Sequence, residues 1–349
     1  MWTITLRDLQ YRGRQFGIAV AGAALVFAIT LVLTGVSSGF RTEARDIVRS
    51  FGADAWVVPA GVSGPFTSHS AIPAAEAERV GRIKGVHEAY PVALVTLTAR
   101  RPDGEVKDIN VIGHDIGALG DPAWGRGRAH APGNETVVDK RLGVHRGDTI
   151  RIAGHRLRVT RVVSHRSYFA GVPAVYVSLR EAQRLSFDRR HLATSIVVRG
   201  TPRRAPRGYQ VMSAGPVRAD LIRPLHGATV AIDTLRVLMW IVAVVIIGAV
   251  TYMSALERVR DFAVLKAVGS SSRSLAASLA AQSIIASAAA AVLGAGIAQL
   301  LKPLFPVPVT ITSDAYVALP VIAIVIGVLS SLTALRRAVG VDPALAFAG

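Results

Sequence analysis

The sequence predicts an α-helical membrane protein with four transmembrane helices in a 1+3 arrangement and a large α+β extracytoplasmic domain between helices 1 and 2. Apolar residues make up 51% of the 349 positions and the mean hydropathy is positive, although the formal net charge is +17. This combination is typical of a membrane protein with basic exposed parts. A bilayer core of about 30 Å needs about 20 helical residues, and four apolar segments are long enough: 16–38, 235–256, 275–301 and 316–335.

The first apolar segment, 16–38, could be read as a cleaved signal peptide or as a permanent helix. It is long for a signal peptide, the run Val36-Ser37-Ser38-Gly39 is a poor cleavage site, and three further spans follow. We therefore predict a permanent anchor.

Basic residues near the span ends predict the orientation. They are Arg7, Arg12 and Arg14 before the first span, Arg258, Arg260, Lys266 and Arg273 between the second and third, and Arg336 and Arg337 after the fourth. Cytoplasmic loops are enriched in Lys and Arg, so we expect three cytoplasmic parts: an amphipathic N-terminal segment at 1–15, a loop at 257–274 and a tail at 336–349. The chain is thus predicted to be a multi-pass protein of the cell (plasma) membrane, with both termini cytoplasmic and a short outer loop at 302–315.

The segment 39–228 between the first two spans is long enough to be a domain. Cysteine is absent, so this domain must fold by burying apolar surface and not by forming disulfides. Hydrophobic patterning predicts a mixture of helices and strands, which indicates an α+β fold. The expected helices are 41–51 (continuing from the first span), 74–83 and 179–185, and the expected strands are 55–58, 92–98, 106–112, 149–152, 157–163, 174–177 and 194–198.

Small residues are frequent in the third span, where Gly294 and Gly296 would allow close backbone approach. This predicts packing against other helices, either within one chain or between two copies. The polar residues of the spans include Gln282 and Gln299, and no buried charge is expected near the bilayer midplane, which disfavours a polar substrate site there.

The run of residues 257–269, E-R-V-R-D-F-A-V-L-K-A-V-G, places five charges directly behind the second span. Glu257 and Asp261 are four residues apart and share a helical face, whereas Phe262 and other apolar residues occupy another face. Gly269 can end this helix in a left-handed conformation. From the pattern alone, the run is either a solvated connector or an element that docks a partner.

At this run the chain resembles the FtsX/MacB-like permease superfamily of ABC transporters, whose equivalent loop typically reads E-R-x-R-E-I-x-V-L-K-A-L-G. The resemblance extends to the start, Leu6-Arg7-Asp8-Leu9, and to the end, where Arg336-Arg337 is followed by Asp342-Pro343-Ala344. Between them, Lys84-Gly85-Val86 and Leu142-Gly143-Val144 also match. The chain is similar as well to actinobacterial members that carry a glutamine-permease label.

The resemblance implies that the run is a coupling helix that docks a separate ABC ATPase. The docking residues would be Glu257, Arg258, Arg260, Asp261, Phe262, Leu265, Lys266 and Gly269. The tail residues Arg336, Arg337, Asp342 and Pro343 would contact the ATPase as well, and Arg7, Arg12 and Arg14 would lie in an N-terminal interfacial helix. The family topology further implies a homodimer above two ATPase subunits.

No phosphate-binding loop of the form G-x-x-x-x-G-K-[ST] occurs in the sequence, so ATP and Mg are expected to bind to the partner ATPase and this chain is expected to be a non-catalytic subunit. The resemblance favours a permease that converts ATP hydrolysis into motion of its extracytoplasmic domain, for export or extraction of a lipidic or envelope-associated substrate. Two alternatives stay open: a non-transporting scaffold that activates an envelope enzyme, and a glutamine-transport permease. An envelope adaptor or a substrate-binding protein would be a further partner, and no nucleic acid is expected.

Three other features of the sequence bear on metal binding, catalysis and contacts with anionic partners. All nine His residues lie between His69 and His226, but without the tight spacing of metal ligands, so no metal site is predicted. The carboxylate pairs Asp103 with Glu105 and Glu76 with Glu78 lack a catalytic framework. Residues 39–228 hold 29 Lys and Arg against 17 Asp and Glu, a net charge of +12, which indicates either contact with membrane lipids and anionic envelope polymers or the drift of an Arg-rich composition.

Overall fold

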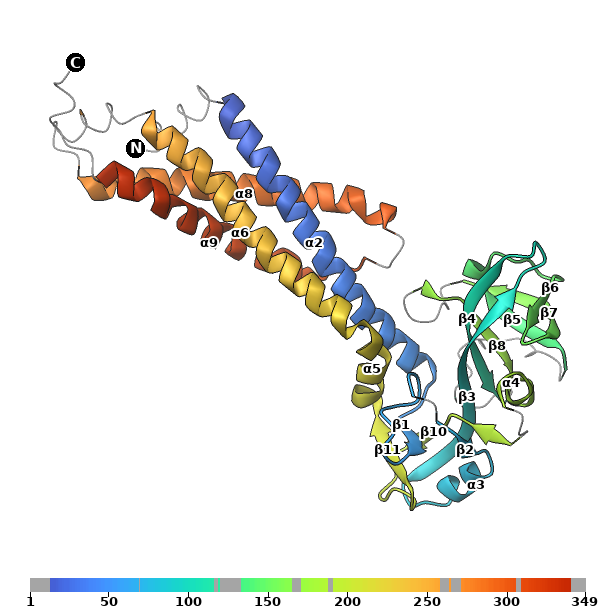
Figure 1. The fold of residues 1–349 in the computed structure, drawn as a ribbon. Helices are drawn as coiled ribbons and strands as arrows, with labels where there is room; N and C mark the ends of the chain where they lie inside the picture. The colour runs from blue at the N-terminus through green and yellow to red at the C-terminus, as the bar shows by residue number, and fades with distance from the viewer. Residues whose placement is uncertain are drawn as a thin grey trace. The chain divides into compact units, whose positions relative to one another are not determined.

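The computed structural model describes residues 13–68, 70–115, 119, 133–164, 171–187, 191–257, 264, 271–305 and 309–339. The chain divides into two compact units (Figure 1). The helical unit consists of Met1–Gly39 with Gly227–Gly349, and the sheet unit is Phe40–His226.

Four long helices carry the apolar segments: α2 (Gly13–Ser50), α6 (His226–Leu256), α8 (Ser272–Leu301) and α9 (Ser313–Val339). Each is long and apolar enough to cross a membrane. The predicted continuation of the first helix to about residue 51 is confirmed, because α2 runs without a break from the helical unit into the sheet unit. Large apolar side chains such as Val245, Leu300 and Val317 are more than half exposed, as expected for surfaces that face lipid.

Within the helical unit, small residues allow the helices to approach closely. A Cβ atom at Gly294 of α8 would lie 2.7 Å from the carbonyl oxygen of Ala24 in α2, so no larger residue fits without a shift. The prediction of close approach is therefore confirmed for Gly294. It is not borne out within one chain for Gly296, which has no neighbour within 4 Å of its hypothetical Cβ.

Hydroxyl groups add specific contacts between the helices. The hydroxyls of Thr251 in α6 and Ser283 in α8 lie 3.0 Å apart, and Ser330 of α9 donates to the Val244 carbonyl at 3.0 Å. These buried hydrogen bonds fix the rotation of α6 against α8 and α9.

The sheet unit is built on a nine-stranded sheet in the order β11-β1-β10-β3-β4-β8-β5-β7-β6. An additional β3–β6 pairing closes six strands, β3-β4-β8-β5-β7-β6, into a ring. Figure 1 shows β4, β5, β6, β7 and β8 gathered in one part of the sheet unit. The bounds are β1 Ala55–Pro59, β3 Val86–Arg100, β4 Val106–His114, β5 Glu135–Asp139, β6 Thr149–Ile152, β7 His155–Val163, β8 Ala174–Ser178, β10 Ser195–Gly200 and β11 Tyr209–Ser213. A separate pair joins β2 (Ile72–Pro73) to β9 (Leu192–Ala193).

Two hydrophobic cores follow from this topology. One lies inside the ring and includes Ile109, Ile150 and Leu157. The other lies where α3 (Glu76–Gly81) packs against β3 and β10, and it includes Val80 and Ile196. The long strand β3 is common to both halves, since its first part pairs with β10 and its last part with β4 and β6.

Most predicted elements of this unit are confirmed. The hairpin of β6 and β7 turns at Ala153 and Gly154, which both have positive φ, as a two-residue type I′ turn requires. The predicted helix at 179–185 is α4 (Leu179–Ser186), capped by the Ser178 hydroxyl, which accepts from the Glu181 amide at 3.2 Å. Strands β2, β5, β9 and β11 and the β3–β6 pairing were not predicted.

Candidate functional site

The predicted ATPase-docking run is described at two positions. Helix α6 ends at Leu256, and the Glu257 amide still donates to the Met253 carbonyl at 3.1 Å, leaving the Glu257 side chain exposed. Val264 is helical and 50% exposed. The docking role of the run stays a prediction. Arg258, Arg260, Asp261, Phe262, Leu265, Lys266 and Gly269 lie outside the described residues, as do Arg7, Arg12, Asp342 and Pro343, whereas the backbones of Arg14 and of Arg336 and Arg337 are described in α2 and α9.

A cluster of three aromatic rings lies at the end of α2 in the sheet unit. Phe51 follows the last residue of this helix, Trp56 lies on β1, and Phe66 belongs to the loop after β1. The ring centroids of Phe51 and Trp56 are 4.8 Å apart in an edge-to-face arrangement, and Phe66 lies 5.5 Å from Trp56 and 6.0 Å from Phe51. Phe51 and Trp56 are almost fully buried, so the end of α2 is packed against the loop.

The same loop is bound by a fully buried carboxylate, Asp220 of α5 (Ala214–Ile222), the helix that precedes α6. One carboxylate oxygen accepts from the amide of Phe66 at 2.9 Å and from the amide of Thr67 at 3.3 Å. The other oxygen accepts from the Thr67 hydroxyl. A Cβ atom at Gly64 would lie 2.2 Å from the Asp220 Cγ, so only glycine fits there without a shift.

We refer to residues 64–67 as the clamp loop. It holds the end of α2 through the ring of Phe66 and holds α5 through Asp220. Because the contacts are specific and use the buried side chains of Asp220, Phe51 and Trp56, the two helix ends are fixed to the same four residues of the sheet unit. Sequence reasoning missed this site, although a lone Asp in an apolar helical turn just before a membrane span was a usable signal.

A pocket of about 340 Å³ adjoins the clamp loop in the sheet unit. Aromatic and aliphatic groups line it together with hydroxyls; its residues include Phe66, Thr67, Ser70, Leu94, Ser186 and Phe187. The Ser186 hydroxyl is buried and has no hydrogen-bond partner among the described residues. Such a mixed lining suits a small amphiphile better than a charged solute.

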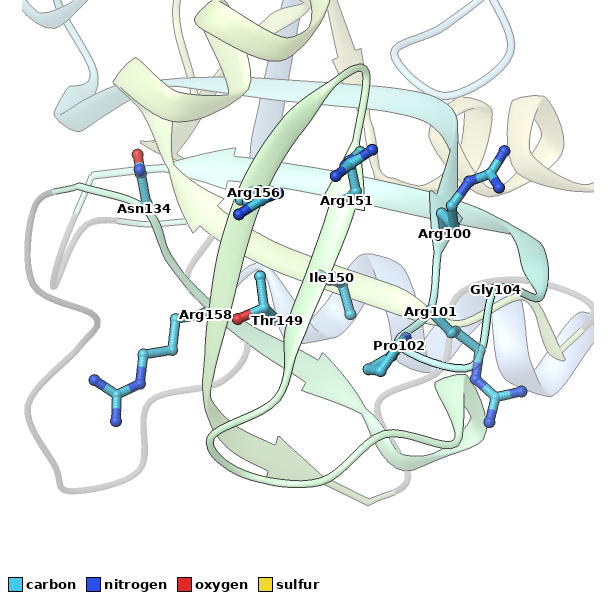
Figure 2. A pocket seen from close by; sticks show the side chains of 10 residues that line it. All are labelled: Arg100, Arg101, Pro102, Gly104, Asn134, Thr149, Ile150, Arg151, Arg156 and Arg158. Atoms are coloured by element: carbon cyan, nitrogen blue, oxygen red, sulfur yellow. The ribbon is translucent and has the colours of Figure 1, made fainter.

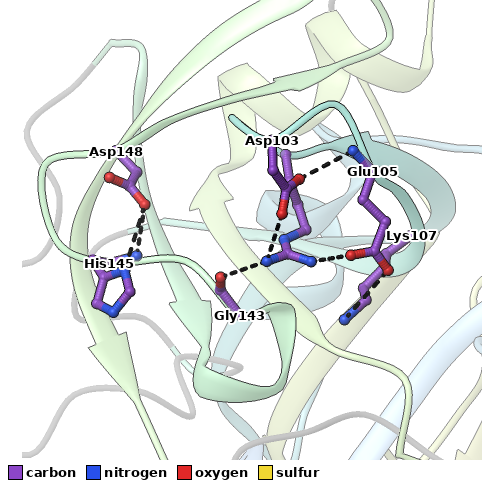
Figure 3. A network of polar contacts seen from close by, with 7 residues as sticks. Asp103, Glu105, Lys107, Gly143, His145 and Asp148 are labelled. Carbon is purple, nitrogen blue, oxygen red and sulfur yellow. Dashed lines mark hydrogen bonds and ion pairs between the residues drawn. The ribbon is translucent and has the colours of Figure 1, made fainter.

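The carboxylates of the two acidic pairs, which lack a catalytic framework in sequence, form ion pairs with arginine. Asp103 and Glu105 both bind the Arg101 guanidinium, which also donates to the Gly143 carbonyl at 2.9 Å (Figure 3). Glu76 accepts from Arg79 at 2.8 Å. Among the described residues, no group of three or more His, Asp or Glu side chains could hold a metal ion.

Four membrane-length helices and a large sheet domain inserted after the first define an integral membrane subunit with an extracytoplasmic domain. Residues 234–343 match the FtsX-like permease C-terminal family, and residues 16–208 match the MacB-like periplasmic core domain. The chain therefore belongs to the FtsX/MacB-like family of ABC transporter permeases. A permease of this family works with an ABC ATPase, and the sheet unit lies within the part that matches the periplasmic core domain.

Proteins similar in sequence over nearly their whole length occur in mycobacteria. Two uncharacterised ABC transporter permeases of Mycobacterium tuberculosis (strain H37Rv) and one of Mycobacterium bovis are each 42% identical over 344 residues, covering 99% of this chain and 98% of each relative. These relatives are described only as ABC transporter permeases, so they lend no support to glutamine transport.

Two solved structures show a weaker likeness. The extracellular domain of the noncanonic ABC-type transporter YknZ from Gram-positive bacteria has a TM-score of 0.34 and 14% identity, covering 46% of this chain and 99% of that one. The periplasmic region of MacB from Actinobacillus actinomycetemcomitans has a TM-score of 0.35 and 13% identity, covering 49% and 94%. Both TM-scores are too low to support a statement about this chain.

Proposed function

We propose that this chain is the permease subunit of an ABC transporter that transmits motion: closure of the partner ATPase in the cytoplasm moves the sheet unit outside. The observation that carries the proposal is the clamp loop, since this one loop holds both the end of α2 and helix α5. Helix α2 continues from the apolar segment to Ser50 without a break, and the next residue, Phe51, contacts Phe66 of the clamp loop. The apolar helical stretch Ala214–Leu256 includes Asp220. Displacement of either helix along its axis would therefore act directly on the sheet.

The assembly that fits this role is a homodimer above two ATPase subunits, with the run at 257–269 as the docking element on each. ATP and Mg would bind to the ATPase. The tail and the N-terminal segment would add contacts on the same cytoplasmic side. In this arrangement, motion would pass from the docking run at 257–269 through the helices to the clamp loop.

The substrate that fits best is lipidic or amphiphilic and associated with the envelope. The mixed pocket beside the clamp loop supports this, because its apolar walls suit an acyl or ring system and its hydroxyls suit a polar head. Since Phe66 and Thr67 line both the pocket and the clamp, motion of the helices would change the pocket directly. Export or extraction from the membrane is the direction consistent with a binding domain outside the bilayer.

The proposal is tested by measuring motion of the sheet unit in the complete complex. The chain contains no cysteine, so Arg82→Cys provides a unique spin-label site at a side chain that is 81% exposed. The complex is purified with its ATPase and reconstituted, and distances between the two labels are measured by pulsed electron resonance without nucleotide and with trapped ATP. A distance change that depends on ATP supports the proposal, and an unchanged distribution in an ATPase-active complex refutes it.

A further inference from the structure

Three arginines form one row across three strands on the outer face of the ring. Arg151 of β6 is paired in register with Arg156 of β7 and with Arg100 of β3. All three side chains are exposed, because Ile150 and Ile152 take the inward positions of β6. Figure 2 shows the row across the three strands. We name Arg100, Arg151 and Arg156 the arginine row.

The arginine row borders a hollow of about 570 Å³. Arg158, which is paired in register with Thr149 on the same face, also lines it, together with Asn134. The hollow therefore combines at least four guanidinium groups with an amide and a hydroxyl that can donate hydrogen bonds.

The charge of the arginine row is not balanced by carboxylates within the described residues. None of its three members has an ion pair there, whereas the adjacent Arg101 binds both Asp103 and Glu105 (Figure 3). Asp108, which is paired with Thr98, is the nearest acidic residue by register on this face of β4, and it makes no ion pair with the row. Glu135 is paired with Arg158, one step away from the row.

Like charges placed directly opposite each other destabilise a sheet. A row of three arginines in register is therefore unfavourable for the empty fold. Among the described residues, carboxylates pair with the neighbouring Arg101 but with no member of the row. An anion bound across the row would remove the repulsion and would be held by several charges at once.

We infer that the arginine row is a binding site for a phosphate-bearing anion with at least two negative charges. The planar guanidinium group donates two parallel hydrogen bonds to phosphate oxygens, and directly opposite residues on neighbouring strands have their Cβ atoms about 5 Å apart. That spacing lets two or three arginines share one diphosphate or two adjacent phosphates. The phosphate could belong to a soluble or polymeric compound or to a lipid headgroup. The anion site depends neither on ATPase docking nor on transmission of motion. A test of the site is therefore independent of a test of the proposed function.

The test uses the full-length chain in a neutral detergent, with titration calorimetry at low and moderate salt. The probes are inorganic pyrophosphate and a short-chain phosphatidic acid, with short-chain phosphatidylcholine as the uncharged control lipid. The variant R151Q/R156Q removes two charges from the row. The matched control R203Q/R204Q removes two charges from exposed arginines of a distant loop in the same unit.

We expect R151Q/R156Q to weaken binding by about tenfold or more, since each charge-assisted hydrogen bond to phosphate contributes on that scale. R203Q/R204Q should bind as the unchanged protein does. R151K/R156K, which keeps the charges and loses the planar fork, should be intermediate. Binding of both probes assigns a soluble or polymeric phosphate, and binding of phosphatidic acid alone assigns a lipid headgroup.

A thermal measurement separates binding from folding. Without ligand, R151Q/R156Q should melt no earlier than the unchanged protein, because it relieves repulsion between exposed groups. Pyrophosphate or phosphatidic acid should raise the melting temperature of the unchanged protein only. The inference is overturned if neither anion binds the unchanged protein, or if the two double variants lose affinity equally.

Discussion

Replacing Asp220 by alanine tests whether the clamp loop holds α5. The substitution leaves the amides of Phe66 and Thr67 and the Thr67 hydroxyl without their acceptor in a site where Asp220 is fully buried. Each unsatisfied buried donor costs about 1–3 kcal/mol. Loss of the buried charge and entry of water offset part of this sum, so we expect about 2–4 kcal/mol of local destabilisation.

Hydrogen exchange reports this change directly. A loss of about 2–4 kcal/mol corresponds to roughly 30-fold to 1,000-fold faster exchange at the amides of the clamp loop. Asp220→Asn is the matched control, since its carbonyl oxygen can accept from both amides and its NH₂ group can donate to the Thr67 hydroxyl. Amide exchange in Asp220→Ala that matches the unchanged protein would refute the clamp.

The clamp also predicts a functional difference between the two variants. Asp220→Asn should keep the change in label distance that depends on ATP, and Asp220→Ala should lose it while the ATPase stays active. If both variants transmit motion equally, Asp220 is a folding determinant and not part of the path.

Three further predictions concern packing and docking. Gly64→Ala should loosen the clamp loop, because its methyl group would lie 2.2 Å from the Cγ atom of Asp220. Faster hydrogen exchange at the amides of the clamp loop would report the change. Gly294→Ala should lower helical-unit stability by about 1–3 kcal/mol in a denaturing-detergent titration, whereas Gly296→Ala, with open space around it, should have little effect; equal effects would contradict the close approach. Charge reversal at Glu257 and Asp261 together should abolish co-purification of the ATPase without changing the melting temperature, and normal assembly of that variant would count against docking at this run.

The helices could be predicted from sequence because a bilayer imposes a length and composition that few soluble helices satisfy. The hairpin of β6 and β7 was predictable for a local reason, since alternating residues flank a turn that ends in Gly154. Strand β5 was missed because Glu135–Asp139 hold only two apolar residues, Val137 and Val138, which are adjacent and give neither an alternating pattern nor a long apolar run. The closure of the ring by β3 and β6 depends on residues about 50 positions apart, which local patterning does not reveal.

The candidate sites, like the strands, could be predicted where their residues are close in sequence and not where they are distant. The docking run is contiguous, so a resemblance could identify it, although most of it lies outside the described residues. The clamp loop brings Asp220 to Phe66 across 154 positions, and neither residue carries a recognisable motif. The arginine row combines a local pair, Arg151 with Arg156, with the distant Arg100, so only two of its three members were within reach of sequence reasoning.

The position of β1 in the sheet has a consequence for synthesis. This strand follows the first membrane helix directly, yet its two neighbours are β10 and β11, so Ala55 pairs with Val198 and Ser213. At about 5–20 residues per second, the ribosome needs roughly 10–30 s to supply those partners. During that interval the apolar strand, which includes Trp56, has been synthesised without its sheet neighbours. We therefore expect the strand to need shielding from aggregation until nearly the whole domain has been made.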